Sequence, residues 1–335
     1  MTEAISATAP GRTSRLRPLT ERILAALPGP RGLWLIVWAL VPWLNAGANL
    51  LLEPGARSDV WDQSRTLIVL NYAALCAAVV VTLWGTARIA RRLEDLRGEL
   101  KDPELPSQPF REVNRVLVPF IAAGVTATAF AATALIEDGW TAALLRGITW
   151  LIVGVPIWTF LWTYASLQLG LHRLGQARLS ADALRAGPSL GLRPLGDLAF
   201  MGLWMLLVWL VPLVLTGLPE AVGVVIGLSV LAAGLATFFL SMLRLHRQMA
   251  DVKARELETA RDLYGQAYEP VRVSPTLETL ERQAPLLRAA EALEKRAGEI
   301  HEWPIDEGTW ARVITIATSV TAITIARLIL DPLGL

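Results

Sequence analysis

Seven long apolar blocks run through the chain, and they constrain its fold more than any other feature. They cover residues 33–52, 67–87, 116–136, 148–171, 198–218, 221–242 and 309–330. About 20 helical residues are needed to cross ~30 Å of hydrocarbon, and each block is close to that length. The sequence therefore predicts an all-α, polytopic integral membrane protein with about seven transmembrane helices.

Composition supports the same class, because 53% apolar residues, 18% charged residues and a mean hydropathy of +0.45 lie outside the range of soluble domains of this size. The first block is not expected to be a cleaved signal peptide, since 32 residues precede it. The predicted organisation is a basic cytosolic N-terminal segment (1–32), a six-helix transmembrane region (33–242), a cytosolic helical hairpin (243–308) and a terminal transmembrane helix (309–335).

Arginine and lysine are distributed unequally between the two sets of loops. One set, together with the N-terminal segment, holds 26 of the 31 basic residues. Cytoplasmic loops retain positive charge, so we predict a multi-pass protein with a cytoplasmic N-terminus and an extracytoplasmic C-terminus. The chain uses 28 arginines against three lysines, which indicates a GC-rich bacterial genome and hence a bacterial inner membrane.

The polar segment before the last block has the pattern of two antiparallel helices. Neither Gly nor Pro occurs between Gly234 and Gly265, so the sixth span is predicted to continue into this segment until Pro270 stops it. A return helix is expected to start at Ser274-Pro275, where Ser is a good N-cap, and to be interrupted or bent near Pro285.

Each arm of this predicted hairpin carries an apolar stripe with three-four spacing. The stripes consist of Leu257, Ala260, Tyr264 and Ala267 on the outgoing arm and Leu277, Leu280, Ala284 and Leu287 on the return arm. Two helices alone leave such stripes under-buried, so we expect contact with other copies of the chain. Packing of the hairpin on residues 88–115 of the same chain is the alternative.

No Asp, Glu, Lys or Arg lies in the central part of the first six blocks, although proton-coupled carriers commonly place an ionisable group there. The polar intramembrane candidates are Asn45, Asn49 and Asn71, whose alternative role is hydrogen bonding between helices. Prolines occur inside three blocks, at Pro42, Pro156 and Pro212, where each removes a backbone hydrogen bond and bends its helix.

The terminal block differs from the others because hydroxyl side chains follow much of its length. They are Thr315, Thr318, Ser319, Thr321 and Thr324. Threonine in a helix can bond its own backbone one turn back, which is a purely structural role. The other interpretation is a helix that faces water, where hydroxyls replace part of an ion's hydration shell. Under that interpretation these five residues are the pore-lining candidates.

Acidic residues collect on the predicted outer face. Four of them are Glu137, Asp138, Glu220 and Asp331. Such a cluster follows simply from the orientation rule for basic residues, or it raises the local concentration of cations at an outer mouth. Both interpretations stay open.

The sequence shows no catalytic, metal-binding or disulfide motif. Cys76 is the single cysteine, so no disulfide framework or thiol metal cluster is expected within one chain. No carboxylate, histidine or cysteine constellation converges at membrane depth, and we therefore expect no enzymatic activity, no catalytic residues, no metal and no cofactor. The expected partners are the lipid bilayer and further copies of the chain; a nucleic acid is not expected, and the sequence does not indicate which ion or small molecule binds.

In topology, the predicted arrangement resembles the insect odorant and gustatory receptor channels: seven spans, an internal N-terminus, and a cytosolic anchor before a last span that ends just outside the membrane. The resemblance implies a tetramer whose final helices line a cation pore. The family's Thr-Tyr and Gln-Phe signature is absent, since the last block reads "TSVTAITIAR".

The leading functional hypothesis is a homo-oligomeric, channel-like protein that passes cations along its terminal helix. The alternatives are a carrier of small apolar or amphipathic molecules, in keeping with the bent and almost uncharged spans, and a non-transporting membrane scaffold whose hairpin recruits cytosolic proteins.

Overall fold

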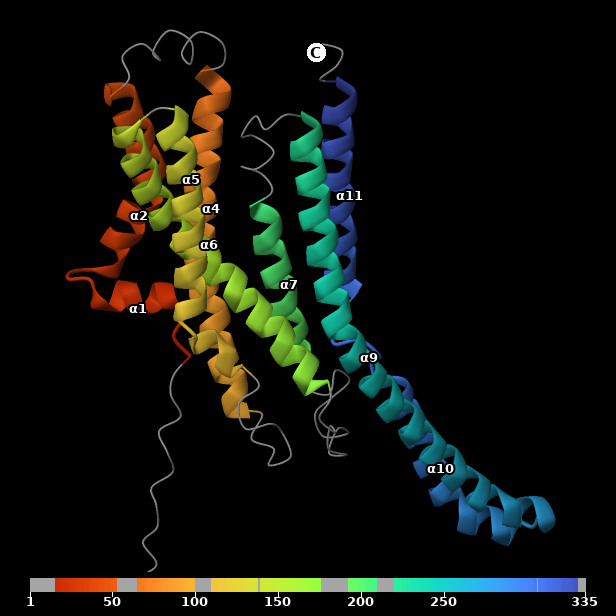
Figure 1. Ribbon diagram of the computed structural model, residues 1–335. Helices are drawn as coiled ribbons and strands as arrows, with labels where there is room; N and C mark the ends of the chain where they lie inside the picture. Colours follow the sequence, from red (N-terminus) through yellow and green to blue (C-terminus); the bar gives the residue numbers. More distant parts are fainter. Residues whose placement is uncertain are drawn as a thin grey trace, which may run out of the picture.

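A computed structural model of the protein describes residues 16–52, 65–99, 110–137, 139–175, 192–209, 220–305 and 307–330. Every regular element in these ranges is helical, which confirms the all-α class for the described part of the chain. In chain order the elements are α1 (Leu19–Ala26), α2 (Arg31–Leu52), α4 (Arg65–Glu99), the short η1 (Arg111–Asn114), α5 (Leu117–Glu137), α6 (Trp140–Leu174), α7 (Arg193–Val208), α9 (Glu220–Val273), α10 (Leu277–Gly298) and α11 (Glu307–Leu330) (Figure 1).

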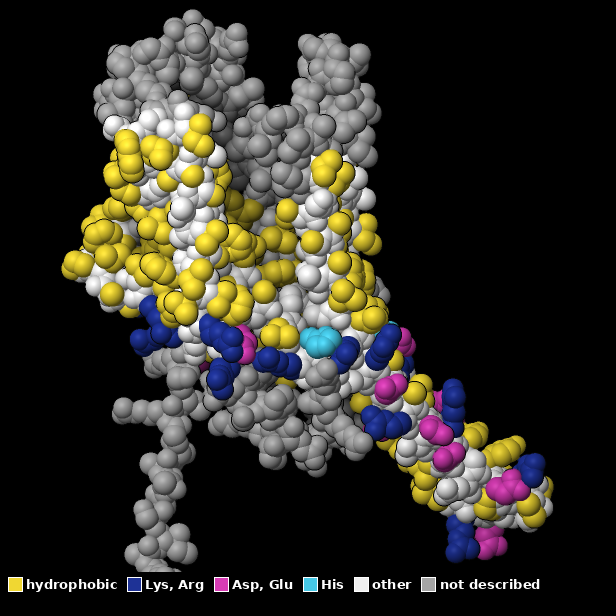
Figure 2. Space-filling view, viewed as in Figure 1, with side chains coloured by type: hydrophobic (Ala, Val, Ile, Leu, Met, Phe, Trp, Pro, Cys, Tyr) yellow, Lys and Arg dark blue, Asp and Glu magenta, His cyan; other side chains and the backbone are white. Residues whose placement is uncertain are grey.

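Four of these helices, α4, α5, α6 and α9, contain a stretch long and apolar enough to cross a membrane. A fifth crossing unit results if α1 and α2, between which the chain bends by 118°, are counted together as one span. Apolar side chains cover the middle of the bundle in Figure 2, and lysines and arginines gather along the lower border of this apolar region. The chain is thus a helical bundle suited to a membrane, with four or five possible spans among the described residues. The full set of seven stays a prediction.

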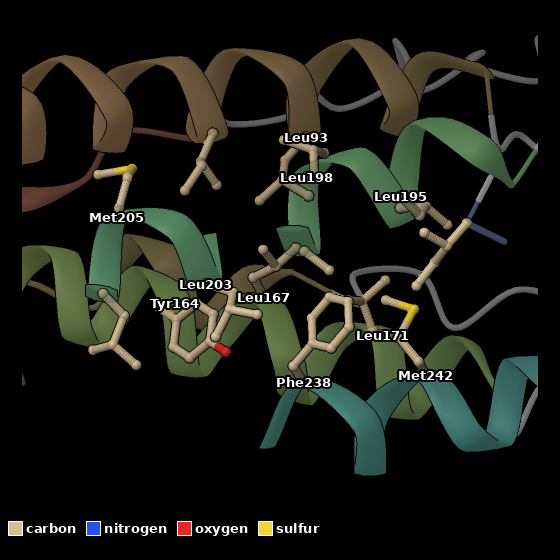
Figure 3. Close-up of a cluster of buried hydrophobic side chains, with 14 of the residues drawn as sticks. Leu93, Tyr164, Leu167, Leu171, Leu195, Leu198, Leu203, Met205, Phe238 and Met242 are labelled. Atoms are coloured by element: carbon tan, nitrogen blue, oxygen red, sulfur yellow. The ribbon is translucent and has the colours of Figure 1, made fainter. Parts of the chain in front are cut away.

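Helix α6 connects the two parts of the bundle. Its earlier residues, such as Val153 and Val155, share a buried cluster with α1, α2 and α4. Its later residues lie in a second cluster with α7 and α9. Figure 3 shows that second cluster, where Leu167 of α6, Leu203 of α7 and Phe238 of α9 gather. Lipid tails are as apolar as these side chains, so close van der Waals packing is what holds such helices together.

The turn between α5 and α6 is shorter than the sequence predicts. Only residues 138 and 139 separate the helices, and Gly139 has a φ of 86°, a left-handed conformation that glycine adopts without a steric penalty. As a result α6 begins at Trp140 rather than near residue 148. Arg146, expected in an outer loop, lies in the second turn of the helix.

The N-terminal segment contains a helix that the sequence analysis missed. Leu19 and Leu24 of α1 are buried against the bundle. The segment is also tied to η1, because the Arg17 backbone N–H donates to Asn114 Oδ1 at 2.8 Å and the Arg22 guanidinium donates to the Asn114 carbonyl oxygen at 3.1 Å. Eight residues are too few for a clear periodic signal, and tertiary contacts stabilise this helix instead.

Helix α9 is continuous over 54 residues, or ~80 Å at ~1.5 Å per residue. It runs beyond the bundle as the outgoing arm of a hairpin, and α10 packs back along it (Figure 1). The predicted stop at Pro270 is wrong by one turn, since the helix passes through Pro270 and ends at Val273. That this hairpin lies in the cytosol stays a prediction.

The start of α10 also differs from the prediction. Thr276, not Ser274, is the N-cap, and its hydroxyl accepts a hydrogen bond from the Thr279 N–H at 3.3 Å. Pro285 does not interrupt the helix, which continues to Gly298. The chain between the arms therefore consists of residues 274–276 alone.

Alanines line the contact between the two arms. Ala260 and Ala267 of α9 lie seven residues apart, as do Ala290 and Ala297 of α10, and all four are 1–3% exposed. Small side chains at heptad spacing let the two backbones approach closely. One ion pair, Arg261 with Glu294 at 3.7 Å, crosses the seam.

The larger side chains of the predicted stripes are less buried than these four alanines. Leu257 and Leu287 are half-buried, whereas Tyr264, Leu277 and Leu280 are 39%, 74% and 44% exposed. On the outgoing arm the predicted stripe contains the buried residues Ala260 and Ala267, whereas on the return arm the closest approach is at Ala290 and Ala297, which the predicted stripe did not include. The exposed residues leave the hairpin with an apolar outer surface.

Candidate functional site

The terminal helix α11 lies at the edge of the bundle, where it contacts α9 and α7 (Figure 1). Val313 and Thr309 are buried on its inner side. Three of the predicted pore-lining residues, Thr315, Thr318 and Ser319, are exposed on the opposite side, and Thr321 is half-buried. Thr324 lies on the helix, but its side chain is outside the described residues.

The threonine hydroxyls of α11 donate to their own helix. Thr315 Oγ1 donates to the Ala311 carbonyl oxygen at 2.8 Å, Thr318 Oγ1 to that of Ile314 at 2.7 Å, and Thr321 Oγ1 to that of Ala317 at 2.8 Å. Each hydroxyl proton is therefore satisfied without a partner helix. The oxygen lone pairs remain available as acceptors, and in Thr315 and Thr318 they lie on the exposed side.

The exposed face of α11 consists mainly of small side chains. Ala311, Thr315 and Ser319 follow one another at four-residue spacing, and Thr318 and Ala322 do the same. Small residues at this spacing are typical of faces on which another transmembrane helix packs. Ala311 and Thr315, at one edge of this face, line a hollow whose other walls come from α4 and α7, whereas no described helix of the same chain covers Thr318 and Ser319.

Several other predicted site residues cannot be placed. The side chains of Asn45, Asn49 and Asn71 lie outside the described residues, although their backbones belong to α2 and α4. The same holds for Glu137, the last residue of α5, and Glu220, the first residue of α9. Asp138 and Asp331 lie outside the described ranges altogether. The outer acidic face thus stays a prediction.

A polar cluster joins α6 to α9 inside the bundle. The Tyr164 hydroxyl donates to the Gly234 carbonyl oxygen at 3.3 Å and lies 3.5 Å from Thr237 Oγ1. The Ser241 hydroxyl donates to Gln168 Oε1. In the sequence, Thr237 and Ser241 follow Ala233 at four-residue spacing, a pattern that predicts a close-packing helix face, whereas Tyr164 and Gln168 were not predicted to belong to a site. The four-residue spacing within each pair was the signal that could have revealed the cluster.

Helices α6, α7 and α9 pack closely around this polar cluster. A Cβ atom at Gly202 of α7 would lie 2.6 Å from the Tyr164 ring, and one at Gly234 would lie 2.5 Å from Leu206. Tyr164 and Gln168 are both buried. The cluster therefore serves to fix α6, α7 and α9 relative to one another.

Aromatic rings close the base of the hairpin, where α9 leaves the bundle and the chain returns into α11. The His246 and Trp303 rings stack with centroids 4.2 Å apart, and His246 Nδ1 lies 2.8 Å from the Glu302 carbonyl oxygen. Trp310 of α11 lies edge-on to Trp303 at 5.4 Å and stacks on Phe239 at 5.3 Å. This contact ties the first turn of α11 to the hairpin.

Metal-binding groups of three or more His, Cys, Asp and Glu residues do not occur among the described residues. Comparison of the chain with protein-family models, curated proteins and solved structures finds no match.

Proposed function

We propose that the protein is a homo-oligomeric, channel-like membrane protein, with a cytoplasmic N-terminus, an extracytoplasmic C-terminus and α11 lining the path. Cations are the proposed permeant species. The proposal rests chiefly on one observation, the exposed hydroxyl side chains of Thr318 and Ser319 on α11, which no described helix of the same chain covers.

The chemistry of that face favours cations. Thr318 and Ser319 would face this path, and the Thr318 hydroxyl donates its proton to the Ile314 carbonyl oxygen of its own helix, so its oxygen is left as an acceptor. Oxygen acceptors replace part of a cation's hydration shell without holding it tightly. The same residues are small, which leaves room for an aqueous passage between α11 helices of neighbouring subunits.

Assembly is supported by the hairpin as well as by α11. Tyr268, Leu280 and Leu286 are 44–47% exposed on the hairpin, where water would surround a single copy. Apolar surface of this kind is commonly covered by a protein contact. A symmetric assembly of hairpins would bring the attached α11 helices together around one axis.

Flux through reconstituted liposomes tests the proposal. Thr318→Leu and Thr321→Leu should each lower cation flux at a given protein density, because a larger apolar group favours dewetting of a narrow passage. The matched control is Thr128→Leu on α5, since Thr128 is also exposed and its hydroxyl also donates to the carbonyl one turn back, at 2.8 Å. The control should leave flux unchanged.

Two results would contradict the channel. Equal flux from Thr318→Leu, Thr321→Leu and the control would remove α11 from the path. An absence of any flux from the unmodified protein, under varied voltage, pH and ionic composition, would favour the carrier or the scaffold.

A non-transporting scaffold is the second candidate, and the hairpin is the observation that favours it. Val273 and Leu277 at its tip are both 74% exposed. Exposed apolar residues on a projecting hairpin are typical of protein-binding surfaces. A scaffold would keep its partner when α11 is altered and lose it when the tip is altered.

A further inference from the structure

Two adjoining hollows form one groove between α4, α7 and α11. The first holds about 560 Å³ and the second about 710 Å³. They share wall residues, namely Arg88, Phe200, Met201 and Arg312. A molecule bound in one hollow can therefore extend into the other.

The first hollow is basic. Four arginines line it, Arg88, Arg92, Arg193 and Arg312, against two carboxylates, Asp95 and Asp197. The lining therefore carries a net charge of about +2, since arginine remains protonated in proteins. Among the described residues, neither Arg92 nor Arg312 forms a salt bridge with a carboxylate. Their planar guanidinium groups match the geometry of a phosphate group.

Two helices begin at this hollow. Arg193 and Pro194 of the first turn of α7 line it, and so do Gly308 and Thr309 of the first turn of α11. The positive ends of two helix dipoles thus lie beside the arginines, and both features favour an anion.

The second hollow is mainly apolar. Trp84 of α4 and Trp204 of α7 line it, 49% and 42% exposed, together with Ala311 and Thr315 of α11. Arg88 marks the join between the two hollows, and its guanidinium carbon lies 5.0 Å from the Trp84 ring centroid. The groove is therefore charged at one end and apolar at the other. A soluble anion would use only the charged end.

We propose that this groove binds one acidic phospholipid from the leaflet on the arginine-rich side of the bundle. The phosphate group lies at Arg92 and Arg312, and an acyl chain follows Trp84 and Trp204. Basic pockets between membrane helices recognise acidic headgroups in this way. The lipid bridges α4, α7 and α11 and so stabilises the bound position of the terminal helix. The proposal is independent of ion conduction, because it concerns retention of a lipid and not flux.

Lipid selectivity of the unmodified protein is the first test. The full chain is delipidated in detergent, and its melting temperature is measured with added dioleoyl phosphatidylglycerol, dioleoyl phosphatidylcholine or inorganic phosphate. Phosphatidylglycerol should raise the melting temperature in a dose-dependent manner, since a ligand that binds only the folded state stabilises it. Equal protection by phosphatidylcholine would overturn the role of the arginines, and equal protection by inorganic phosphate would overturn the lipid as occupant.

The second test uses variants at both ends of the groove. The measurement is the amount of phosphatidylglycerol that stays bound to each variant in native mass spectrometry. Arg92→Gln with Arg312→Gln should weaken retention roughly tenfold or more, because each basic residue near an anionic lipid contributes to binding. Ala311→Trp fills the apolar hollow without changing charge and should also reduce retention, which covers the case in which the arginine variant does not fold.

The matched control removes two arginines elsewhere. Arg111 and Arg247 are exposed and do not line the groove, so Arg111→Gln with Arg247→Gln should retain the lipid. Equal loss in the control and in the groove variant, or full retention by Ala311→Trp, would overturn the site.

Discussion

The indole N–H of Trp38 in α2 donates to the carbonyl oxygen of Ile152 in α6, at 2.6 Å. This carbonyl lies four residues before Pro156, which has no N–H to offer it. The tryptophan therefore replaces the backbone hydrogen bond that the proline removes. Helix α6 stays continuous through Pro156, and α2 is fixed at that level of the bundle.

The first prediction concerns this replacement. Trp38→Phe keeps an aromatic ring but removes the donor, and it should destabilise the protein by about 1–3 kcal/mol, the cost of leaving this part-buried carbonyl oxygen without a donor. In a Pro156→Ala background, a backbone N–H again reaches the Ile152 carbonyl, so the same change should cost clearly less. Melting temperatures in detergent for the four members of this cycle measure the difference. Trp140→Phe, at a tryptophan that is 78% exposed, is the control; identical costs in both backgrounds would refute the replacement.

A second prediction follows from the close approach of α7 to the segment before α11. A Cβ atom at Gly196 would lie 2.1 Å from the Pro304 carbonyl oxygen, whereas a Cβ atom at Gly265 in the hairpin would meet nothing within 4 Å. Gly196→Val should therefore lower the melting temperature and the yield of folded protein. Gly265→Ala should be neutral or stabilising by up to about 1 kcal/mol, because alanine favours a helix over glycine. A tolerated Gly196→Val would contradict the packing at this contact.

Substitutions at buried and at exposed positions of the hairpin should affect folding and assembly separately. Ala290 is 1% exposed in the alanine seam, so Ala290→Glu places a charge where the arms meet and should open the hairpin at a cost of several kcal/mol. Leu280 and Leu286 are 44% and 47% exposed, so Leu280→Glu with Leu286→Glu should leave the protomer folded and weaken contacts between copies. Limited proteolysis reports the first effect, and mass in detergent reports the second. An unchanged mass for the double variant would exclude this surface from the subunit interface.

Topology provides a further prediction. In a Cys76→Ser background, Ser274→Cys at the hairpin tip should react with an impermeant thiol reagent only after the cells are permeabilised, because basic segments remain in the cytoplasm. Leu335→Cys should react in intact cells. Labelling of the first cysteine but not the second in intact cells would reverse the proposed orientation.

The sequence by itself determined the helical class, the apolar character of the bundle and the continuous helix that leaves it. These features depend on local composition: apolar length for α4, α5 and α9, and the absence of Gly and Pro between residues 234 and 265. It also located the hydroxyl-bearing face of α11, since Thr315, Thr318 and Ser319 recur at helical spacing.

Only the tertiary structure decided which residues meet. The pairing of Trp38 with the carbonyl freed by Pro156 joins positions 114 residues apart, and the groove collects arginines from α4, α7 and α11. Helix α1 and the return-arm alanines Ala290 and Ala297 were likewise missed, because buried contacts with other elements, rather than local periodicity, set their positions. Spacing along one helix fixes which side chains share a face, but the neighbour that covers this face is chosen by packing over the whole bundle.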